Sequence, residues 1–324
     1  MKSFWKELPK PFFALAPMED VTDSVFRQIV ASCARSDVFF TEFTSVEGLC
    51  SRGKDKIIHR FQFTESERPI IAQIWGMHPE NYFEIAKLIV NLGFAAIDIN
   101  MGCPERVVLK HGACAGLINN RPLASEIIKA TQAGAGDLPV SVKTRIGLNT
   151  IITEDWIPFL LSHNLDALTI HGRTAKEMSD VPCHWEEIKK AVELRNKLNP
   201  NTVIIGNGDV EDYADGIKKV KEYGVDGVMI GRGIFKNLWA FSQKSQEPKS
   251  LEEMLQLLLR HARLFTQTWG DRKNFLVLRR FFKIYVSGFP DAARLREALM
   301  QSSSLEDIET IIARFKQEQT DGLH

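Results

Sequence analysis

The stretch Ala95-Ala-Ile-Asp-Ile-Asn-Met-Gly-Cys-Pro104 joins an apolar run to a polar end and a thiol. Residues 95–99 are typical of a buried β-strand, and Gly102 permits a sharp turn after it. Pro104 fixes the backbone just beyond Cys103. The sequence therefore places Cys103 at the end of a strand. There it is either a small buried apolar residue, as most free cysteines are, or a nucleophile or proton donor.

The same pattern of a short apolar run followed by a helical segment recurs along the chain. Eight strands are predicted, at Phe12–Ala16, Val38–Glu42, Ile70–Trp75, Ala95–Asn100, Val140–Arg145, Ala167–His171, Val203–Gly206 and Gly227–Ile230. Continuous aliphatic runs of this kind are typical of parallel strands that are buried on both faces. Asp20 and Asp209 are predicted to cap the helices that follow them.

Eight strand–helix units within residues 1–242 match a (β/α)8 TIM barrel, which usually takes about 250 residues. An open doubly wound sheet is the alternative, but no strand is followed by a Gly-x-Gly-x-x-Gly loop. Beyond a polar linker at Ser242–Ser250 the pattern is helical, without a strand signal. We therefore expect a small all-helical domain at residues 250–316 and a flexible tail at 317–324.

Composition restricts the class of protein. The chain has 324 residues, 44% of them hydrophobic and 25% charged, as in ordinary soluble proteins. No signal peptide or run of about 20 apolar residues is visible, so no membrane association is expected. The five cysteines show no metal-ligand spacing, so we expect no metal site and a cytoplasmic location.

The charge is balanced overall but unevenly distributed. The 41 basic and 41 acidic residues argue against a uniformly basic nucleic-acid binder. Between Arg260 and Arg296, however, nine basic residues are opposed only by Asp271 and Asp291. This asymmetry indicates either a polyanion partner or a solvated helical surface.

Polar residues follow the predicted strands at the end where a barrel carries its active site. They are Glu42, Gln73, Asn100, Cys103, Lys143, Arg145, His171, Arg173, Asn207, Asp209 and Arg232, and the first strand ends in the apolar Ala16-Pro17-Met18. Glycine-rich turns follow the last two strands, at Gly206–Gly208 and Gly231–Gly233, where TIM barrels commonly bind phosphate. Arg232 adds a cation there, and Lys143 with Gln73 would suit the polar edge of a flavin.

These motifs resemble those of the tRNA-dihydrouridine synthase family. The matching segments are Ala-Pro-Met-Glu-Asp-Val-Thr-Asp (16–23), Thr-Glu-Phe (41–43), Asp-x-Asn-x-Gly-Cys-Pro (98–104), Lys-Thr-Arg (143–145), His-Gly-Arg-Thr (171–174), Gly-Asn-Gly-Asp (206–209) and Ile-Gly-Arg-Gly (230–233). The resemblance implies FMN as cofactor, NADPH as reductant and a D-loop uridine of tRNA as substrate. The FMN-binding residues that it implies are Ala16, Pro17, Met18, Gln73, Asn100, Lys143, His171, Asn207, Gly208, Asp209, Gly231 and Arg232.

The implied reaction gives the thiol a task. Reducing the C5=C6 bond of uracil needs a hydride at C6, from the reduced flavin, and a proton at C5, which Cys103 could supply as general acid. The residues expected to contact tRNA are Arg145, Arg173, Lys176, Arg272, Lys273, Arg279, Arg280 and Lys283. A monomer is expected.

Two alternatives and two departures from the family pattern stay open. One alternative is an FMN enzyme that reduces a free small molecule, and the other is a catalytically silent RNA-binding protein on the same scaffold. The loop 177–183 lacks the aromatic residue and the glycine that the family often carries there. Cys114 stands among small residues, as a packing residue or with a redox role.

Overall fold

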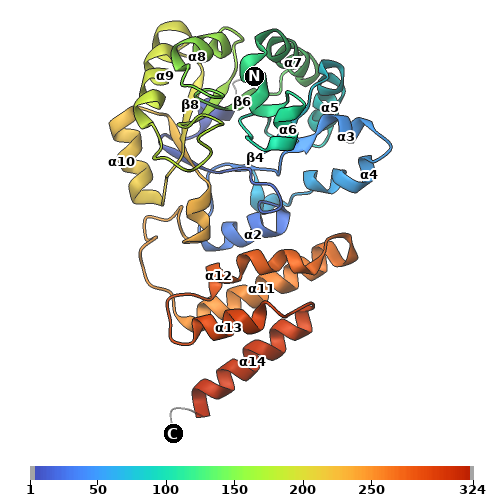
Figure 1. Ribbon diagram of the computed structural model, residues 1–324, viewed down its shortest axis with the longest axis vertical. Coiled ribbons are helices and arrows are strands. Elements are labelled where there is room, and N and C mark those ends of the chain that lie inside the picture. The colour runs from blue at the N-terminus through green and yellow to red at the C-terminus, as the bar shows by residue number, and fades with distance from the viewer. Residues whose placement is uncertain (1–3, 322–324) are drawn as a thin grey trace.

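The computed structural model describes residues 4–321, which form a parallel β-barrel surrounded by helices and, beyond it, a helical part (Figure 1). The strands pair in the order β1-β9-β8-β7-β6-β5-β4-β2, and β3 pairs with β4. A parallel bridge between Ala14 and Val38 brings the two ends of this path together. The predicted (β/α)8 barrel is thereby confirmed.

Seven of the eight predicted strands are found within two residues of their expected bounds, and the second is broken. The strands are β1 (Phe12–Leu15), β2 (Phe39–Phe40), β3 (Thr44–Ser45), β4 (Ile70–Trp75), β5 (Ala96–Met101), β6 (Val140–Arg145), β7 (Ala167–His171), β8 (Val203–Asn207) and β9 (Gly227–Ile230). Between β2 and β3 the carboxylate of Glu42 is buried and accepts a hydrogen bond from the Asp20 amide, 2.8 Å away. The pairing with β4 is interrupted at Glu42, where its side chain turns toward the loop that carries Asp20.

The helices cover the outside of the barrel and form all the regular structure after it. They are α1 (Phe4–Glu7), α2 (Ser24–Cys33), α3 (Val46–Cys50), α4 (Lys54–Ile57), α5 (Pro79–Asn91), α6 (Arg106–Lys110), α7 (Arg121–Ala135), α8 (Thr153–Leu161), α9 (Trp185–Leu198), α10 (Tyr213–Tyr223), α11 (Leu251–Trp269), α12 (Phe282–Tyr285), α13 (Ala292–Leu299) and α14 (Leu305–Asp321). Short 3-10 helices are η1 (Ile58–Phe61), η2 (Glu65–Glu67), η3 (Cys114–Asn119), η4 (Arg232–Phe235), η5 (Gly270–Arg272) and η6 (Phe275–Phe281).

The caps of two helices lie three residues beyond the predicted ones. The cap of α2 is Asp23, whose carboxylate accepts a hydrogen bond from the amide of Phe26, and the cap of α10 is Asp212. Asp20 and Asp209 instead have left-handed backbones, with φ of 53° and 49°. Both loops carry two aspartates, and the one nearer the helix caps it. The earlier aspartate is then free for other contacts.

The N-terminal end of the barrel is closed by α1. Trp5 is fully buried, with its ring centroid 5.9 Å from that of Phe12 and 6.4 Å from that of Phe40. The same apolar cluster contains Ala96 and Ala167 at the first residues of their strands. Burying a large apolar side chain contributes roughly 1.5–3 kcal/mol. A site in the barrel is therefore reached from the carboxyl ends of the strands.

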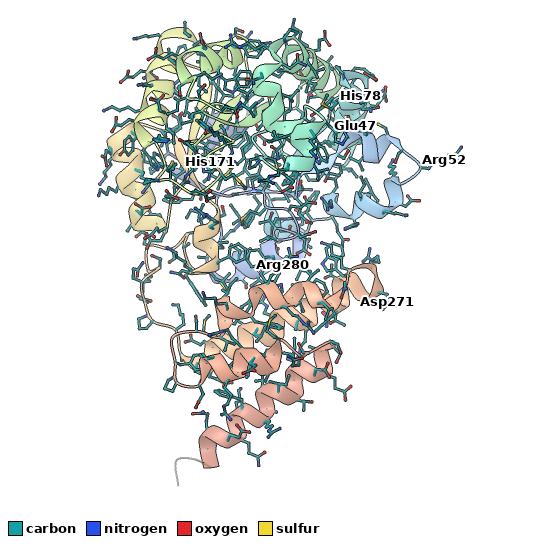
Figure 2. The ribbon with its side chains drawn as sticks, in the orientation of Figure 1. Glu47, Arg52, His78, His171, Asp271 and Arg280 are labelled. Atoms are coloured by element: carbon teal, nitrogen blue, oxygen red, sulfur yellow. The ribbon has the colours of Figure 1, made fainter. Side chains whose placement is uncertain are left out.

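Helix α11 lies against α2 of the barrel, whereas α14 packs on α11 and lies farthest from the barrel (Figure 1). The rings of Phe26 and Phe281 stack with centroids 4.8 Å apart, and Figure 2 shows Arg280 at the same junction. Lys273 Nζ lies 2.9 Å from the Asp23 carboxylate and 3.5 Å from that of Glu42. Apolar and ionic contacts thus both hold the helical part to the barrel.

The end of the chain differs from its prediction. The tail expected from residue 317 is helical up to Asp321, because α14 continues to that point, and residues 322–324 lie outside the described residues. Within residues 4–321 no helix is long and apolar enough to cross a bilayer.

Candidate active site

The register of the barrel brings the polar strand ends together. Asn100 on β5 lies opposite Lys143 on β6, and His171 on β7 lies between Arg145 on β6 and Asn207 on β8. Neighbouring parallel strands end at the same rim, so these side chains meet at the open end of the barrel.

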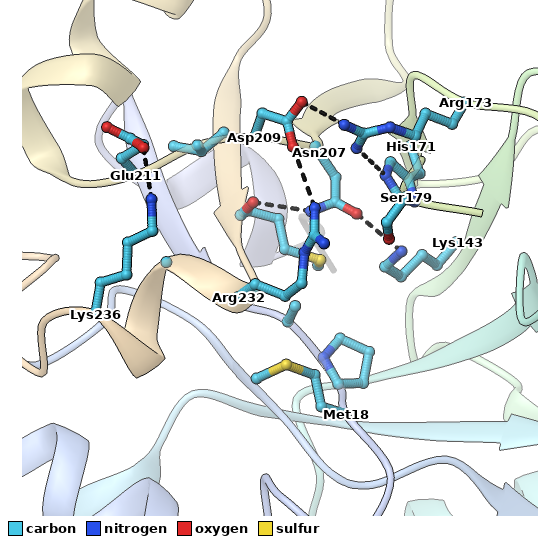
Figure 3. Close-up of a pocket in the computed structure, with 17 residues that line it drawn as sticks. Met18, Lys143, His171, Arg173, Ser179, Asn207, Asp209, Glu211, Arg232 and Lys236 are labelled. Atoms are coloured by element: carbon cyan, nitrogen blue, oxygen red, sulfur yellow. Dashed lines mark hydrogen bonds and ion pairs between the residues drawn. The ribbon is translucent and has the colours of Figure 1, made fainter. Parts of the chain in front are cut away.

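A cleft of about 530 Å³ opens at this rim (Figure 3). Its volume lies within the usual range of cofactor sites, roughly 300–1,000 Å³. It is lined by Ala16, Pro17, Met18, Lys143, His171, Arg173, Ser179, Asn207, Gly208, Asp209, Val210, Glu211, Met229, Gly231, Arg232, Gly233 and Lys236. Ten of the twelve residues predicted to bind the cofactor are among them, and Gln73 and Asn100 are not.

Sequence reasoning missed several members of the cleft wall. They are Ser179, Val210, Glu211, Met229 and Lys236. The ammonium of Lys236 pairs with Glu211 at 2.8 Å, at the mouth of the cleft (Figure 3). Lys236 follows Arg232 by four residues, about one helical turn. This spacing was the one signal in the sequence that Lys236 would face the same cleft as Arg232.

Lys143 offers a cation to the cleft. It is half-buried, and its ammonium donates a hydrogen bond to Asn207 Oδ1 at 3.0 Å. The Asn207 amide is oriented in turn by its own donation to the carbonyl of Met229, 2.9 Å away. Burial, followed by the nearby Arg145, lowers the pKa of Lys143 to about 8. Among the described residues no carboxylate forms an ion pair with Lys143. The cleft therefore holds a cation suited to a carbonyl or anionic ligand.

The other end of the cleft carries two arginines around one aspartate (Figure 3). Arg173 forms an ion pair with Asp209, and Arg232 lies 3.4 Å from the same carboxylate. Burial, followed by the surrounding cations, holds the pKa of His171 well below its usual range, so this imidazole is neutral near pH 7. Arg232 remains 64% exposed and is available to an anion.

Glycine is required at position 208 for steric reasons. Gly208 has a φ of 120°, and a Cβ there would lie 2.5 Å from the sulfur of Cys183 and 2.9 Å from His171. The turn after β8 passes so close to the next loop that only a residue without a side chain fits.

Gln73 and Asn100 lie below the rim in a buried hydrogen-bonded chain. Gln73 donates to the carboxylate of Asp98 at 2.7 Å and accepts from the amide of Asn100 at 3.2 Å. Asn100 Oδ1 accepts the backbone N–H groups of Gly102 and Cys103, both at 3.0 Å. Asn100 thus shapes the turn that carries the thiol, a role that its position at a strand end did not reveal.

Cys103 borders a second cavity of about 430 Å³ rather than the cleft. This cavity is lined by Glu19, Phe43, Thr44, Ser45, Ile57, Arg60, Trp75, Cys103, Glu105 and Val108, none of which lines the cleft. The neighbouring thiol of Cys114, opposed by burial, lowers the pKa of Cys103 to about 7. At neutral pH the side chain is therefore present both as thiol and as thiolate.

Two arginines expected at the RNA-facing rim point inward. Arg145 is 6% exposed and Arg173 2%. Arg145 donates to the carbonyls of Gly102 at 2.8 Å and Thr174 at 2.9 Å, so it braces the loops around the cleft. Neither side chain lies on the surface, because the loops supply buried acceptors, and the contact of these two arginines with tRNA stays a prediction.

The other predicted RNA contacts divide into two groups. Lys273 is engaged in the ion pairs at the junction, and Arg279 donates to the carbonyl of Ser302 at 3.0 Å. The exposed side chains are those of Lys176, Arg272, Arg280 and Lys283, of which Arg280 also donates to the carbonyl of Asp20 at 2.6 Å. Within residues 4–321 no three or more His, Cys, Asp or Glu side chains form a group that could hold a metal ion.

The fold and the site define an α/β-barrel enzyme with its reactive groups at the carboxyl ends of the strands. The structure of morphinone reductase shares this fold, with a TM-score of 0.53 at 12% identity, covering 73% of this chain and 86% of that one. The family model described as dihydrouridine synthase matches residues 14–320. The chain belongs to this family.

Two curated relatives agree over nearly the full length. The "Probable tRNA-dihydrouridine synthase" of Staphylococcus aureus (strain COL) is 46% identical over 318 residues, covering 97% of this chain and 96% of that one. The "Probable tRNA-dihydrouridine synthase 2" of Bacillus subtilis (strain 168) is 44% identical over 325 residues, covering 99% of each chain.

Proposed function

We propose that this protein reduces a D-loop uridine of tRNA to dihydrouridine, with FMN as cofactor and NADPH as reductant. Family membership and relatives named for this activity support dihydrouridine synthesis by a flavin-dependent oxidoreductase with tRNA as substrate. One observation in this chain carries the proposal: a thiol of lowered pKa and a cation without a carboxylate partner lie at the same barrel mouth.

The cleft fits FMN in shape and chemistry. Ala16, Pro17 and Met18 offer an apolar wall for a planar ring system, and Lys143 offers a cation to its polar edge. Arg232, at the glycine-rich turn after β9, would hold the phosphate. When bound, the flavin supplies a hydride to C6 of uracil and recovers its electrons from the nicotinamide.

The residues of the chain account for the remaining chemistry. Cys103 donates its proton to C5 as the hydride reaches C6, so that the C5=C6 bond becomes a single bond. A donor whose pKa is close to the operating pH is the most effective general acid. Asn100 holds the turn so that the thiol stays at the cavity wall. Lys143 would stabilise negative charge at the polar edge of a bound flavin ring, and neutral His171 would add no competing charge.

Access to the site requires the uridine to leave its stack in the RNA, which costs a few kcal/mol. The second cavity would admit the RNA beside Cys103, with Phe43 and Trp75 as aromatic walls. Exposed cations at Lys176, Arg272, Arg280 and Lys283 would contact phosphates and offset part of that cost.

Replacing Lys143 by Met tests the cofactor assignment. We expect FMN to bind at least about 10-fold more weakly, because a hydrogen bond to a charged group contributes about 1.5–3 kcal/mol. Fluorescence titration of the flavin-free protein with FMN measures the change. Lys129→Met, on the exposed side of α7, is the matched control and should bind FMN like the original protein. A flavin-free preparation that FMN cannot reconstitute would contradict the assignment.

Charge reversal on the helical part tests its contact with RNA. The double variant Arg272→Glu/Lys283→Glu should bind tRNA more weakly and show a shallower salt dependence, by about 0.7–0.9 in log–log slope for each phosphate that the protein no longer neutralises. Fluorescence anisotropy over a salt series measures both quantities. NADPH oxidation should be unchanged, and Lys129→Glu is the control. Equal affinity at matched salt would remove the helical part from the RNA site.

We also propose that the protein acts as a monomer in the cytoplasm. All five cysteines are free thiols, as is usual in a reducing compartment. The exposed large apolar side chains of the described residues are few and, apart from Val90 and Leu92 at the end of α5, come from separate elements, which is typical of a monomer surface. Sedimentation analysis would test the oligomeric state.

A further inference from the structure

The five thiols of this chain differ sharply in reactivity. Burial raises the pKa of Cys33 to about 11 and that of Cys183 to about 12, and it also raises the pKa of the exposed Cys50. Only Cys103 has a lowered pKa, about 7, and it is partly exposed on a cavity wall. Cys103 is therefore the thiol that oxidants would attack first.

Cys114 is the partner of this thiol. It begins η3 and is fully buried, and its thiol is the main cause of the lowered pKa of Cys103. The backbones of the two segments are joined as well, because the amide of Ala115 donates to the carbonyl of Cys103 at 3.4 Å. Cys114 has a φ of 49°, an unfavourable backbone for a residue with a side chain. The fold thus bears a conformational cost where Cys114 meets Cys103.

The proposed reaction gives Cys114 no task. It lines neither the cleft nor the second cavity, and burial keeps its pKa well above the usual range, so it stays a thiol. A buried thiol beside an accessible thiol of lowered pKa is the arrangement of a resolving cysteine.

We propose that Cys103 and Cys114 form a reversible disulfide when a peroxide oxidises Cys103. This is a modification site that protects the thiol from irreversible oxidation. While the disulfide lasts, uridine reduction would be suspended. Only this consequence of the disulfide rests on the proposed function.

The steps balance with hydrogen peroxide as oxidant. The Cys103 thiolate attacks one peroxide oxygen, the O–O bond breaks, and the products are a sulfenic acid and hydroxide, which is protonated to water. The sulfur of Cys114 then attacks the sulfenic sulfur. The S–S bond forms, the S–O bond breaks, and the hydroxide leaves with the proton of Cys114 as water. The two thiols together lose two electrons to the peroxide, and an external dithiol returns them.

The local backbone allows the two sulfurs to approach. A disulfide needs them about 2.05 Å apart, closer than in a thiol–thiol contact. Ala113, Cys114 and Ala115 are fully buried, so the Cys114 side is fixed in the core. On the Cys103 side, α6 has only five residues and its Val107 is 65% exposed. Gly112, with a φ of 76°, lies between the two sides. The approach of the two sulfurs is therefore expected to come from movement of the Cys103 side.

Treating the FMN-bound protein with hydrogen peroxide, without RNA, tests the proposal. We expect the intact mass to fall by about 2 Da, a cross-linked peptide that contains both cysteines, and full reversal by dithiothreitol. In Cys114→Ser the same treatment should give a dimedone-reactive Cys103, then a gain of about 32 Da that dithiothreitol does not reverse. Cys50→Ser is the control and should behave like the original protein.

The outcomes separate this proposal from the proposed function. If the original protein gains about 32 Da on Cys103 as fast as Cys114→Ser and forms no cross-linked peptide, the disulfide is excluded. The cross-linked peptide is measured in the original protein, so the test stands even if Cys114→Ser folds poorly. A reversible disulfide in a protein that still reduces tRNA at the full rate would support the modification site and refute the role of Cys103 as proton donor.

Discussion

Replacing Cys103 by Ala should slow uridine reduction by about 10²–10⁴-fold and leave FMN bound, since a positioned general acid typically contributes this much. The substitution removes the proton donor but none of the cleft wall, because Cys103 borders the second cavity only. Binding of FMN and its reduction by NADPH should therefore continue at the original rate.

The measurement is dihydrouridine formed per enzyme in a single turnover, by mass spectrometry of digested tRNA. Cys50→Ala is the matched control, because Cys50 is an exposed thiol that lines neither cavity. Unchanged turnover in Cys103→Ala would eliminate its assigned role, and loss of FMN would show that the thiol acts on the cofactor site instead.

The pH dependence gives the same prediction a second readout. Cys103 must be protonated to donate, and its pKa is about 7, so the rate should fall as pH rises above 7. Lys143 must be a cation, and its pKa of about 8 adds a second loss in the same direction. In Cys103→Ala the first of these losses should disappear, while the second remains.

The barrel could be predicted from sequence because its strands are short, continuous apolar runs at regular intervals. The exception was the second strand, where Glu42 turns inward toward the loop of Asp20. A run of residues cannot reveal this, since the partner lies in another loop. The prediction of the helix caps was wrong for a related reason. Each loop carries two aspartates, and only the backbone conformation decides which of them caps the helix.

The candidate site divides in the same way. Ten of the twelve expected cofactor residues line one cleft, because the parallel topology forces strand ends to one rim, whereas Gln73, Asn100 and Cys103 do not line it. The sequence could not tell that Arg145 and Arg173 would find buried acceptors, since charged loop residues are usually exposed. Nor could it pair Lys273 with Asp23, 250 residues away. Sequence therefore predicted which residues meet, and only the structure shows which way they face.

The contact between α2 and the loop before β4 supports a large stability prediction. Arg27 and Glu67 form an ion pair with both side chains fully buried. Arg27 also donates to the carbonyls of Thr22 at 2.6 Å and Gln62 at 2.8 Å. Arg27→Met would leave the carboxylate of Glu67 buried without its cation, so we expect the free energy of unfolding to fall by about 3–5 kcal/mol.

Urea unfolding of the flavin-free protein, followed by circular dichroism, measures this change. The double variant Arg27→Met/Glu67→Leu should recover most of the loss, because replacing a whole buried pair by apolar residues is often neutral. Lys190→Met, which breaks an exposed pair with Glu187, should cost at most about 1 kcal/mol. If Arg27→Met also lowers the free energy of unfolding by at most about 1 kcal/mol, the Arg27–Glu67 ion pair does not hold α2 in place. Phe26 on this helix stacks on Phe281. If Arg27→Met destabilises the protein as expected, it should therefore also loosen the packing of the helical part on the barrel and weaken tRNA binding.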